Sequence, residues 1–340
     1  MKATLEKVRG GLEATVVIVH DDGDLATCKF LLSEYEKNGL SGTIAMVADR
    51  IIKLPSDELN TEAIAEWREL LDSGRFSVSC HSRTHAFWGL TDEEEDGLID
   101  DGGEGIPYHR EAGRITREVR DAGELLRAAF PSQRVRAFVK PGFGKHKNGV
   151  QISEKAYEII KRHYVAMRNT GGGVESIPPK DPYNIRSYMV RGGDSAEDWI
   201  SYTETAIAEH GMIVYLFHNI KDKASTLTVA KSDACILFAH LGKRLSEGKI
   251  HVTSLDEAAL YGEELRAAKL SLAEATDAVI LSLETGLDPD VYDLPLTVRI
   301  DGADGELISE DGRPIVKRNG SHLVDVKPGE RIRLIRSAIN

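Results

Sequence analysis

The chain has 340 residues, of which 41% are hydrophobic and 29% are charged, and its formal net charge at pH 7 is −12. A chain of this length can bury a large core, so we expect one large domain or a domain with a small addition. The acidic balance argues against nucleic acid and anionic membrane surfaces as partners, because both are bound through clustered lysine and arginine.

The compartment is indicated by the amino terminus and by the cysteines. No apolar run is long enough to predict a transmembrane helix, and residues 1–7 lack the apolar core of a signal peptide. A cytoplasmic protein is therefore expected, or a secreted one if a signal peptide was removed. The three cysteines, Cys28, Cys80 and Cys235, lie far apart and predict neither a disulfide framework nor a paired-cysteine zinc site. The sequence leaves open whether the chain forms a homo-oligomer.

From residue 15 onward, short β-branched runs alternate with helical stretches. Thr15–Val19 is typical of a parallel strand buried on both faces, and residues 24–38 then show helical spacing that ends at Asn38-Gly39. Further strands are expected over 42–47, 76–80, 135–139, 164–167, 185–190, 212–217 and 250–252. Further helices are expected over 60–72, 113–129, 152–162, 195–209, 227–246 and 255–267. Repeated strand–helix units predict a parallel sheet, and about seven to eight strands favour closure into a (β/α) barrel.

The pattern changes after about residue 268. Short β-rich pieces are separated there by turn signals such as Asp301-Gly302 and Asn319-Gly320. We therefore predict two domains, a barrel over residues 1–267 and a small antiparallel β-domain over residues 268–340. Nothing in the second domain indicates catalysis.

Polar clusters follow directly on four of the expected strands. They are His20-Asp21-Asp22, the segment from His81 to His85, Lys140-Pro141-Gly142 and His218-Asn219. In a (β/α) barrel the carboxyl ends of all strands meet on one face, where active sites lie. The four clusters are therefore expected to converge. Asp24 is expected to cap the next helix, but that explanation does not cover the preceding two aspartates.

His81 and His85 are four residues apart and would supply part of a metal site. If this segment forms a helical turn, both imidazoles lie on one face and can bind a single cation. Catalytic zinc usually takes three protein ligands and keeps one position open. Together, the histidine pair, a carboxylate and a further histidine supply three metal ligands with an acid and a base.

The ordered set of motifs resembles the polysaccharide deacetylase family, also called the NodB homology domain. The first two family motifs are matched by Asp21-Asp22-Gly23 and by His81-Ser82-Arg83-Thr84-His85. The third resembles residues 138–144, the fourth is approached by Asp198-Trp199, and the fifth is matched by Leu216-Phe217-His218. The resemblance covers roughly residues 12–267.

The resemblance implies a distorted barrel of about seven strands and a deacetylase acting on N- or O-acetyl groups of a carbohydrate. It implies a divalent metal, commonly zinc, held by Asp22, His81 and His85. Asp21 would be the general base that takes a proton from metal-bound water. His218 would be the general acid that protonates the departing amine or alkoxide.

The remaining implied residues concern the substrate. The oxyanion would rest on the metal and on the backbone N–H of Gly142 or a neighbour, in the loop that also holds Lys140 and Pro141. Trp199 would form an apolar wall for the acetyl methyl group or a sugar face. The acidic segment 91–105 would be either a solvated loop or a lid over the histidines.

Val139 departs from the family pattern. Many members carry an arginine near this position, where it orients the base, and valine cannot do so. Lys140 points to the opposite side if the strand continues. Three interpretations stay open: a deacetylase with altered surroundings of the base, a non-catalytic carbohydrate-binding barrel that retains the metal, and an amidohydrolase acting on a small non-sugar amide.

Overall fold

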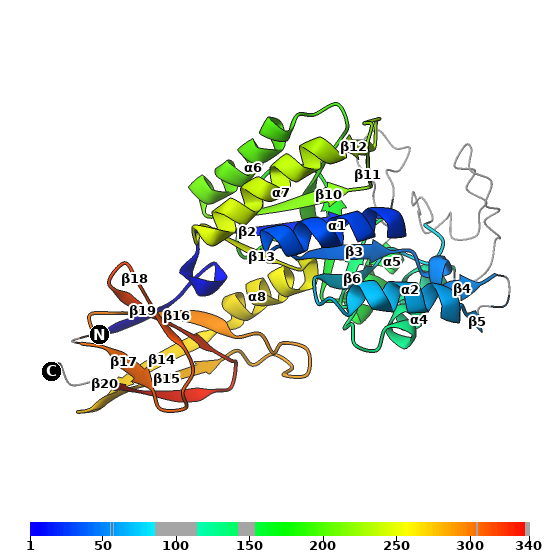
Figure 1. The fold of residues 1–340 in the computed structure, drawn as a ribbon. Coiled ribbons are helices and arrows are strands. Elements are labelled where there is room, and N and C mark those ends of the chain that lie inside the picture. Colours follow the sequence, from blue (N-terminus) through cyan, green and yellow to red (C-terminus); the bar gives the residue numbers. More distant parts are fainter. Residues whose placement is uncertain (55, 57, 86–113, 142–153, 304, 337–340) are drawn as a thin grey trace.

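A closed barrel of parallel strands forms the centre of the molecule (Figure 1). The structure is a computed structural model that describes residues 1–54, 56, 58–85, 114–141, 154–303 and 305–336. Seven strands pair in the order β10-β9-β8-β7-β6-β3-β2, and β10 pairs with β2 to close the ring. Their bounds are β2 (Ala14–His20), β3 (Gly42–Met46), β6 (Phe76–Cys80), β7 (Ala137–Val139), β8 (Ala166–Thr170), β9 (Ile185–Met189) and β10 (Met212–Phe217). The predicted (β/α) barrel of about seven strands is confirmed.

The ring is distorted at β2. Strand β3 pairs only with the last two residues of β2, whereas β13 (Ile250–Thr253) pairs with residues 14–17 and so branches from the ring. Helix α8 (Leu255–Ala267) follows β13 and packs Leu255 and Ala259 against the apolar side chains inside the barrel. Small and β-branched residues fill this interior, among them Val17, Val19, Ala45, Ala137, Val139, Ala166 and Val214.

Side chains alternate along each strand and give the barrel two apolar layers. In β2, Val17 and Val19 point inward, while Val16 and Ile18 pack outward against the helices, as the period of two requires. The surrounding helices are α1 (Leu25–Asn38), α2 (Thr61–Leu71), α3 (Arg114–Thr116), α4 (Ala122–Ala129), α5 (Glu154–His163), α6 (Ala196–Glu209) and α7 (Lys231–Ser246). None of the described helices combines the length and apolar character needed to cross a membrane.

The predicted ends of α1 are confirmed, and two other elements differ from their expected form. The Asp24 side chain accepts the backbone N–H of Thr27, and α1 ends at Gly39 with a φ of 70°. Strand β7 begins at Ala137 instead of residue 135, because Val135 has a φ of 39°, which no strand residue adopts. The helical run expected over 113–129 contains a π-helical turn at Arg117–Asp121 between α3 and α4.

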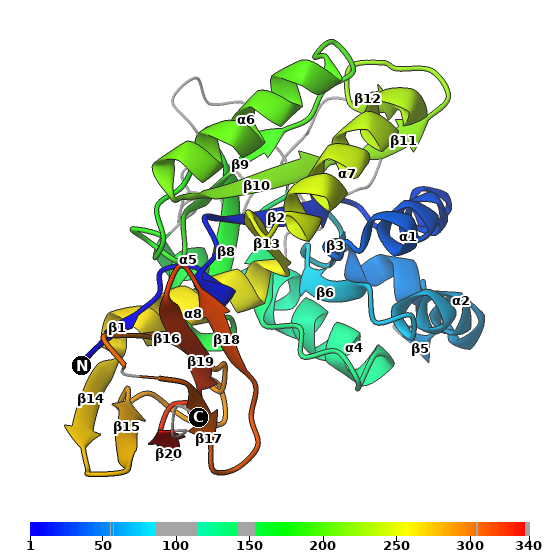
Figure 2. The ribbon, with the colours of Figure 1, turned by 60° about the vertical axis from the view of Figure 1, so that its left-hand side comes forward.

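The chain after α8 forms a β-sandwich beyond the amino ends of the barrel strands, and the amino terminus of the chain lies on it (Figures 1 and 2). Its antiparallel sheets have the orders β1-β16-β19-β18 and β14-β15-β20-β17. The strands are β1 (Lys2–Leu5), β14 (Lys269–Glu274), β15 (Ala278–Glu284), β16 (Leu296–Asp301), β17 (Leu307–Ser309), β18 (Ile315–Arg318), β19 (Ser321–Val326) and β20 (Arg331–Arg336). The predicted antiparallel β-domain is confirmed, and β1 joins it by pairing with β16. Two short pairs, β4 (Ile52–Lys53) with β5 (Glu58–Leu59) and β11 (Asn219–Lys221) with β12 (Thr228–Ala230), lie outside both domains' main sheets.

Glu264 of α8 is a buried carboxylate between the barrel and the chain leading into the sandwich. Its side chain is fully buried, and Oε1 accepts the backbone N–H of Leu294 at 2.9 Å. Oε2 has no hydrogen-bond partner among the described residues. Burial raises the pKa of Glu264 to about 7, although the hydrogen bond from Leu294 opposes the shift.

This carboxyl group makes stability depend on pH. Because the folded-state pKa lies above that of the unfolded chain, the contribution to stability is present below about pH 4.5 and is lost as pH rises to about 7. We expect Glu264→Gln to unfold at higher urea concentration than the wild type near pH 8, by up to about 3 kcal/mol, and to match it near pH 5. Glu36→Gln, on the exposed face of α1, is the control and should show no such pH-dependent gain. Equal effects of Glu264→Gln at both pH values would contradict the prediction.

Candidate functional site

Polar residues at the carboxyl ends of the barrel strands lie close together, as expected. The Asp21 N–H donates to the Phe217 carbonyl at 2.8 Å, so Asp21 and His218 leave neighbouring strands at the same level. The His81 N–H donates to the Met46 carbonyl at 2.9 Å and continues the pairing of β6 with β3. The residues that follow β2, β6 and β10 therefore face one another at one end of the barrel.

Asp22, His81 and His85 form the candidate metal centre. One atom of each lies within 4.8 Å of the other two. Asp22 Oδ1 is 3.1 Å from His85 Nε2 and 3.5 Å from His81 Nε2. Ligand atoms about 2.0–2.2 Å from a tetrahedral zinc ion are roughly 3.3–3.5 Å apart, so the separations suit such an ion. His81 is buried, whereas the side chains of Asp22 and His85 are about one third exposed, which leaves the site open on one side.

Hydrogen bonding within the centre also fits a cation. His81 Nδ1 lies 2.8 Å from the Val139 carbonyl, which can only accept, so Nδ1 carries the proton and Nε2 presents a lone pair to Asp22. Asp22 Oδ1 is buried without a hydrogen-bond partner among the described residues. A carboxylate oxygen and an imidazole lone pair at this distance repel each other unless a positive charge lies between them. The residues therefore fit a divalent metal.

The segment from His81 to His85 is a strained loop and not the helical turn considered from the sequence. Ser82 and His85 have φ values of 63° and 61°, and Asp22 has a φ of 70°. Non-glycine residues in this left-handed region cost about 1–3 kcal/mol each and persist where the surroundings hold them. Here the Ser82 hydroxyl accepts the His85 N–H at 3.0 Å, and the Ser82 carbonyl accepts the Ala48 N–H at 3.1 Å.

Asp21 is held by an arginine that the sequence did not single out. Arg168 Nη2 donates to Asp21 Oδ2 at 2.6 Å, and both side chains are buried, with 1% and 4% exposure. Arg168 lies on β8 and is the register partner of Val139 on β7. An arginine therefore reaches Asp21 from the strand next to the one that holds Val139. The only sequence signal was an arginine inside the otherwise apolar strand Val165-Ala166-Met167-Arg168.

The other oxygen of Asp21 is not engaged. Asp21 Oδ1 is buried and has no hydrogen-bond partner among the described residues. Asp21 Oδ2 is 3.8 Å from His81 Nε2, so the carboxylate adjoins the candidate metal centre. A buried carboxylate with one oxygen fixed by a guanidinium and one oxygen free can accept a proton from a group that enters the site.

His218 and Lys140 are titratable groups with lowered pKa values. Burial lowers the pKa of His218, and the charges of Asp21 and Asp22 partly offset the effect. Burial also lowers the pKa of Lys140 to about 8, helped by the charge of Arg168. The Lys140 N–H donates to the Arg168 carbonyl at 3.1 Å, which places Lys140 beside the site where β7 ends.

The structure treats differently the other residues that were predicted to contact the substrate. Pro141 is buried directly after Lys140. Gly142 and the acidic segment 91–105 lie outside the described residues. Trp199 does not take its predicted role: its side chain is fully buried in the outer core, edge to face with Phe217 at 6.3 Å. It faces inward because the apolar face of α6 packs on the barrel, so it cannot form a wall for a substrate.

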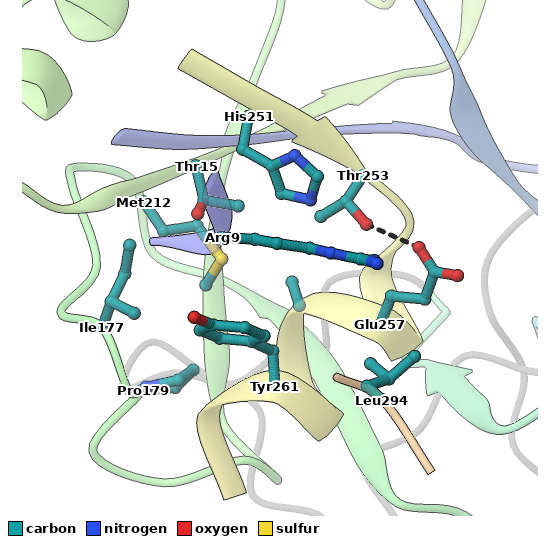
Figure 3. A pocket seen from close by; sticks show the side chains of 11 residues that line it. Arg9, Thr15, Ile177, Pro179, Met212, His251, Thr253, Glu257, Tyr261 and Leu294 are labelled. Atoms are coloured by element: carbon teal, nitrogen blue, oxygen red, sulfur yellow. Dashed lines mark hydrogen bonds between the residues drawn. The ribbon is translucent and has the colours of Figure 1, made fainter. Parts of the chain in front are cut away.

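A small cavity at the opposite end of the barrel is not a second candidate (Figure 3). It lies at the starts of β2 and β10 and is lined by Arg9, Thr15, Met212, His251 and Tyr261 among others. Its volume of about 20 Å³ holds one water molecule and no substrate. This cavity therefore offers no room for a substrate.

Comparisons with known proteins give structural neighbours and no sequence match. No family model and no curated protein matches the sequence. The chain is similar to a family 4 acetyl xylan esterase from Clostridium thermocellum in complex with a cobalt ion, at 14% identity, covering 73% of this chain and 92% of that one, with a TM-score of 0.44. It is similar to a mutant of the peptidoglycan deacetylase PdaC from Bacillus subtilis, at 12% identity, covering 75% and 92%, with a TM-score of 0.38. A CE4 family pseudoenzyme from Bacillus anthracis matches at 12% identity, covering 73% and 66%, with a TM-score of 0.40. What this chain does has to follow from its own residues.

Proposed function

We propose that this chain is a metal-dependent hydrolase that removes acetyl groups from a carbohydrate, in the manner of the polysaccharide deacetylases its motifs resemble. The observation that carries the proposal is the cluster of Asp22, His81 and His85 beside the buried pair Asp21 and Arg168. A metal-ligating triad adjoining an anchored carboxylate is the set of groups that activates water for attack on an acyl carbon.

Asp22, His81 and His85 would hold the metal, and zinc is our candidate because two imidazoles and one carboxylate suit it. When bound, such an ion polarises the acyl oxygen and lowers the pKa of a coordinated water. The imidazole of His81 is oriented for this role by the Val139 carbonyl. Asp22 would supply a carboxylate oxygen to the metal beside the two imidazoles.

Asp21 is proposed as the general base. Arg168 holds Oδ2, so the free Oδ1 accepts the proton of the attacking water. His218 is proposed as the general acid that gives its proton to the leaving amine or alkoxide. The lowered pKa of His218 makes the imidazolium a stronger acid than free histidine, at the cost of a smaller protonated fraction. Proximity of the two groups follows from the pairing of β2 with β10.

Lys140 is proposed to contact the substrate at the rim of the site. With a pKa of about 8, it is mostly protonated near neutral pH and can donate to an acyl or sugar oxygen. Pro141 and Gly142, which follow it, are proposed to shape the same part of the site, with the Gly142 backbone N–H as a donor to the oxyanion.

The two alternatives differ in what supports them. A non-catalytic sugar-binding barrel was suggested by the valine at position 139, but Arg168 supplies the missing contact to Asp21. An amidohydrolase acting on a small non-sugar amide would use the same base, acid and metal, so it remains the competing assignment of substrate.

The proposal is tested by elemental analysis of the purified protein and by acetate release from oligomers of chitin, xylan and glycosaminoglycans. We expect about one equivalent of a transition metal and acetate release from at least one oligomer. A metal-loaded protein that releases acetate from none of them, but does so from small N-acetyl amides, would support the amidohydrolase. A protein that binds no metal would overturn both assignments.

A further inference from the structure

Glu118 is a buried carboxylate that contacts the loop between the two histidines. Its side chain is 4% exposed, and it lies in the π-helical turn Arg117–Asp121. Glu118 Oε2 accepts the backbone N–H groups of Arg83 and Thr84, each at 3.0 Å. Glu118 Oε1 accepts the Thr84 hydroxyl at 2.7 Å. One side chain from another part of the chain therefore takes three hydrogen bonds from the two residues before His85.

This contact falls where the loop most needs support. Arg83 and Thr84 lie between Ser82 and His85, both of which have a positive φ. Without Glu118, two backbone N–H groups would lose their partners in a partly buried segment, and the strained conformation would lose much of what holds it. Among the described residues, the segment is also contacted by the Ala48 and Asp49 N–H groups and by the Asp49 carboxylate.

The π-helical turn that contains Glu118 is itself held in place by side-chain contacts. The Tyr164 hydroxyl donates to the Val119 carbonyl within the same π-helical turn, at 2.6 Å. Tyr164 lies so close to Gly123 that a Cβ there would come within 2.2 Å of the hydroxyl. Turns of this type are rare and often occur at functional sites. The position of the Glu118 carboxylate is thus determined by packed neighbours on α4 and in the connection between α5 and β8.

We infer that Glu118 is a positioning residue for the metal centre, which sets the affinity for the metal by fixing His85 relative to His81 and Asp22. The inference rests on the proposed metal site. Groups that hold ligands in place typically change metal affinity by about 10- to 100-fold when they are removed. Glu118 touches neither metal ligand nor substrate, so its effect passes through the loop backbone.

The test measures zinc affinity of the full chain by competition with a chromogenic chelator, in proteins shown to be folded by circular dichroism. Glu118→Ala is expected to weaken zinc binding about 10- to 100-fold. Glu118→Gln should stay within about threefold of the wild type, because its amide oxygen can accept both N–H groups and its NH₂ can donate to the Thr84 oxygen. Glu124→Ala, on the exposed face of α4, is the control and should leave affinity unchanged.

Each outcome decides the inference. A folded Glu118→Ala with wild-type affinity overturns it. If Glu118→Ala does not fold, Glu118→Asp is used, because it keeps the charge but withdraws the carboxylate by one methylene. A loss of zinc affinity of about fivefold or more in Glu118→Asp supports the inference, and unchanged zinc affinity overturns it. A wild-type protein without measurable zinc affinity would refute the metal site itself, which is a different failure from a tight site that ignores Glu118.

Discussion

Asp21→Asn is expected to lower kcat for acetate release by about 10³- to 10⁴-fold while zinc stays bound. A general base typically contributes about 10²- to 10⁴-fold, and asparagine has the shape of the aspartate but cannot accept a proton from water. The neutral amide would also leave Arg168 without its charged partner, which places the loss in the upper part of that range. The measurement is the steady-state rate with metal content determined on the same sample.

Asp24→Asn is the matched control, because it changes an aspartate of the same turn that caps α1 and lies outside the proposed machinery. Asparagine is a good helix cap, so kcat should stay close to that of the wild type. A folded, metal-loaded Asp21→Asn that retains more than about a tenth of the wild-type kcat would remove Asp21 from the role of base.

The convergence of the three candidate metal ligands could be predicted from the sequence because each of them follows a strand. Asp22, His81 and His85 come after buried runs with clear β character, and parallel strands bring their carboxyl ends to one face. That reasoning needs only the order of the elements. It does not need the register or the loop conformation, and this is why it brings the three candidate ligands together.

The contacts around the candidate metal centre depend on strand register and helix geometry, which the sequence pattern does not specify. Arg168 reaches Asp21 because β7 and β8 pair in a particular register, and a single sequence does not give that register. Trp199 was predicted to contact the substrate from a loosely matched motif, but it lies on the buried face of α6 and therefore packs in the core. Glu118 lies 35 and 34 positions after the residues it contacts, 83 and 84, and it belongs to a π-helical turn that the sequence pattern does not predict.

The ring of seven strands explains why an arginine on β8 can do what one on β7 would do. Counting round the barrel from β2, β7 is the third strand through β3 and β6, and β8 is the third strand through β10 and β9. The two strands opposite Asp21 are therefore equivalent by distance round the ring. Val139 and Arg168 are paired at the same level on these strands, and Val139 points into the interior. An arginine at either position can extend across the interior towards Asp21.

Arg168→Met is accordingly expected to lower kcat by about 10²- to 10³-fold, because Asp21 loses the buried group that orients it. In the Asp21→Asn background, Arg168→Met should have little further effect on kcat, since the two residues act as a unit.

The decisive variant is the exchange of the pair, Val139→Arg with Arg168→Val. Removing one partner of a buried ion pair costs about 3–5 kcal/mol, so Arg168→Met is also expected to be less stable than the wild type. The exchange returns an arginine to the interior from β7 and should recover both stability and at least about a tenth of the wild-type kcat. Arg168→Met combined with Val139→Leu, which adds volume without charge, is the control for repacking and should not recover activity.

If the exchange folds and binds zinc but is no faster than Arg168→Met, the two strand positions are not equivalent. If Arg168→Met is itself as active as the wild type, Arg168 has no part in orienting the base.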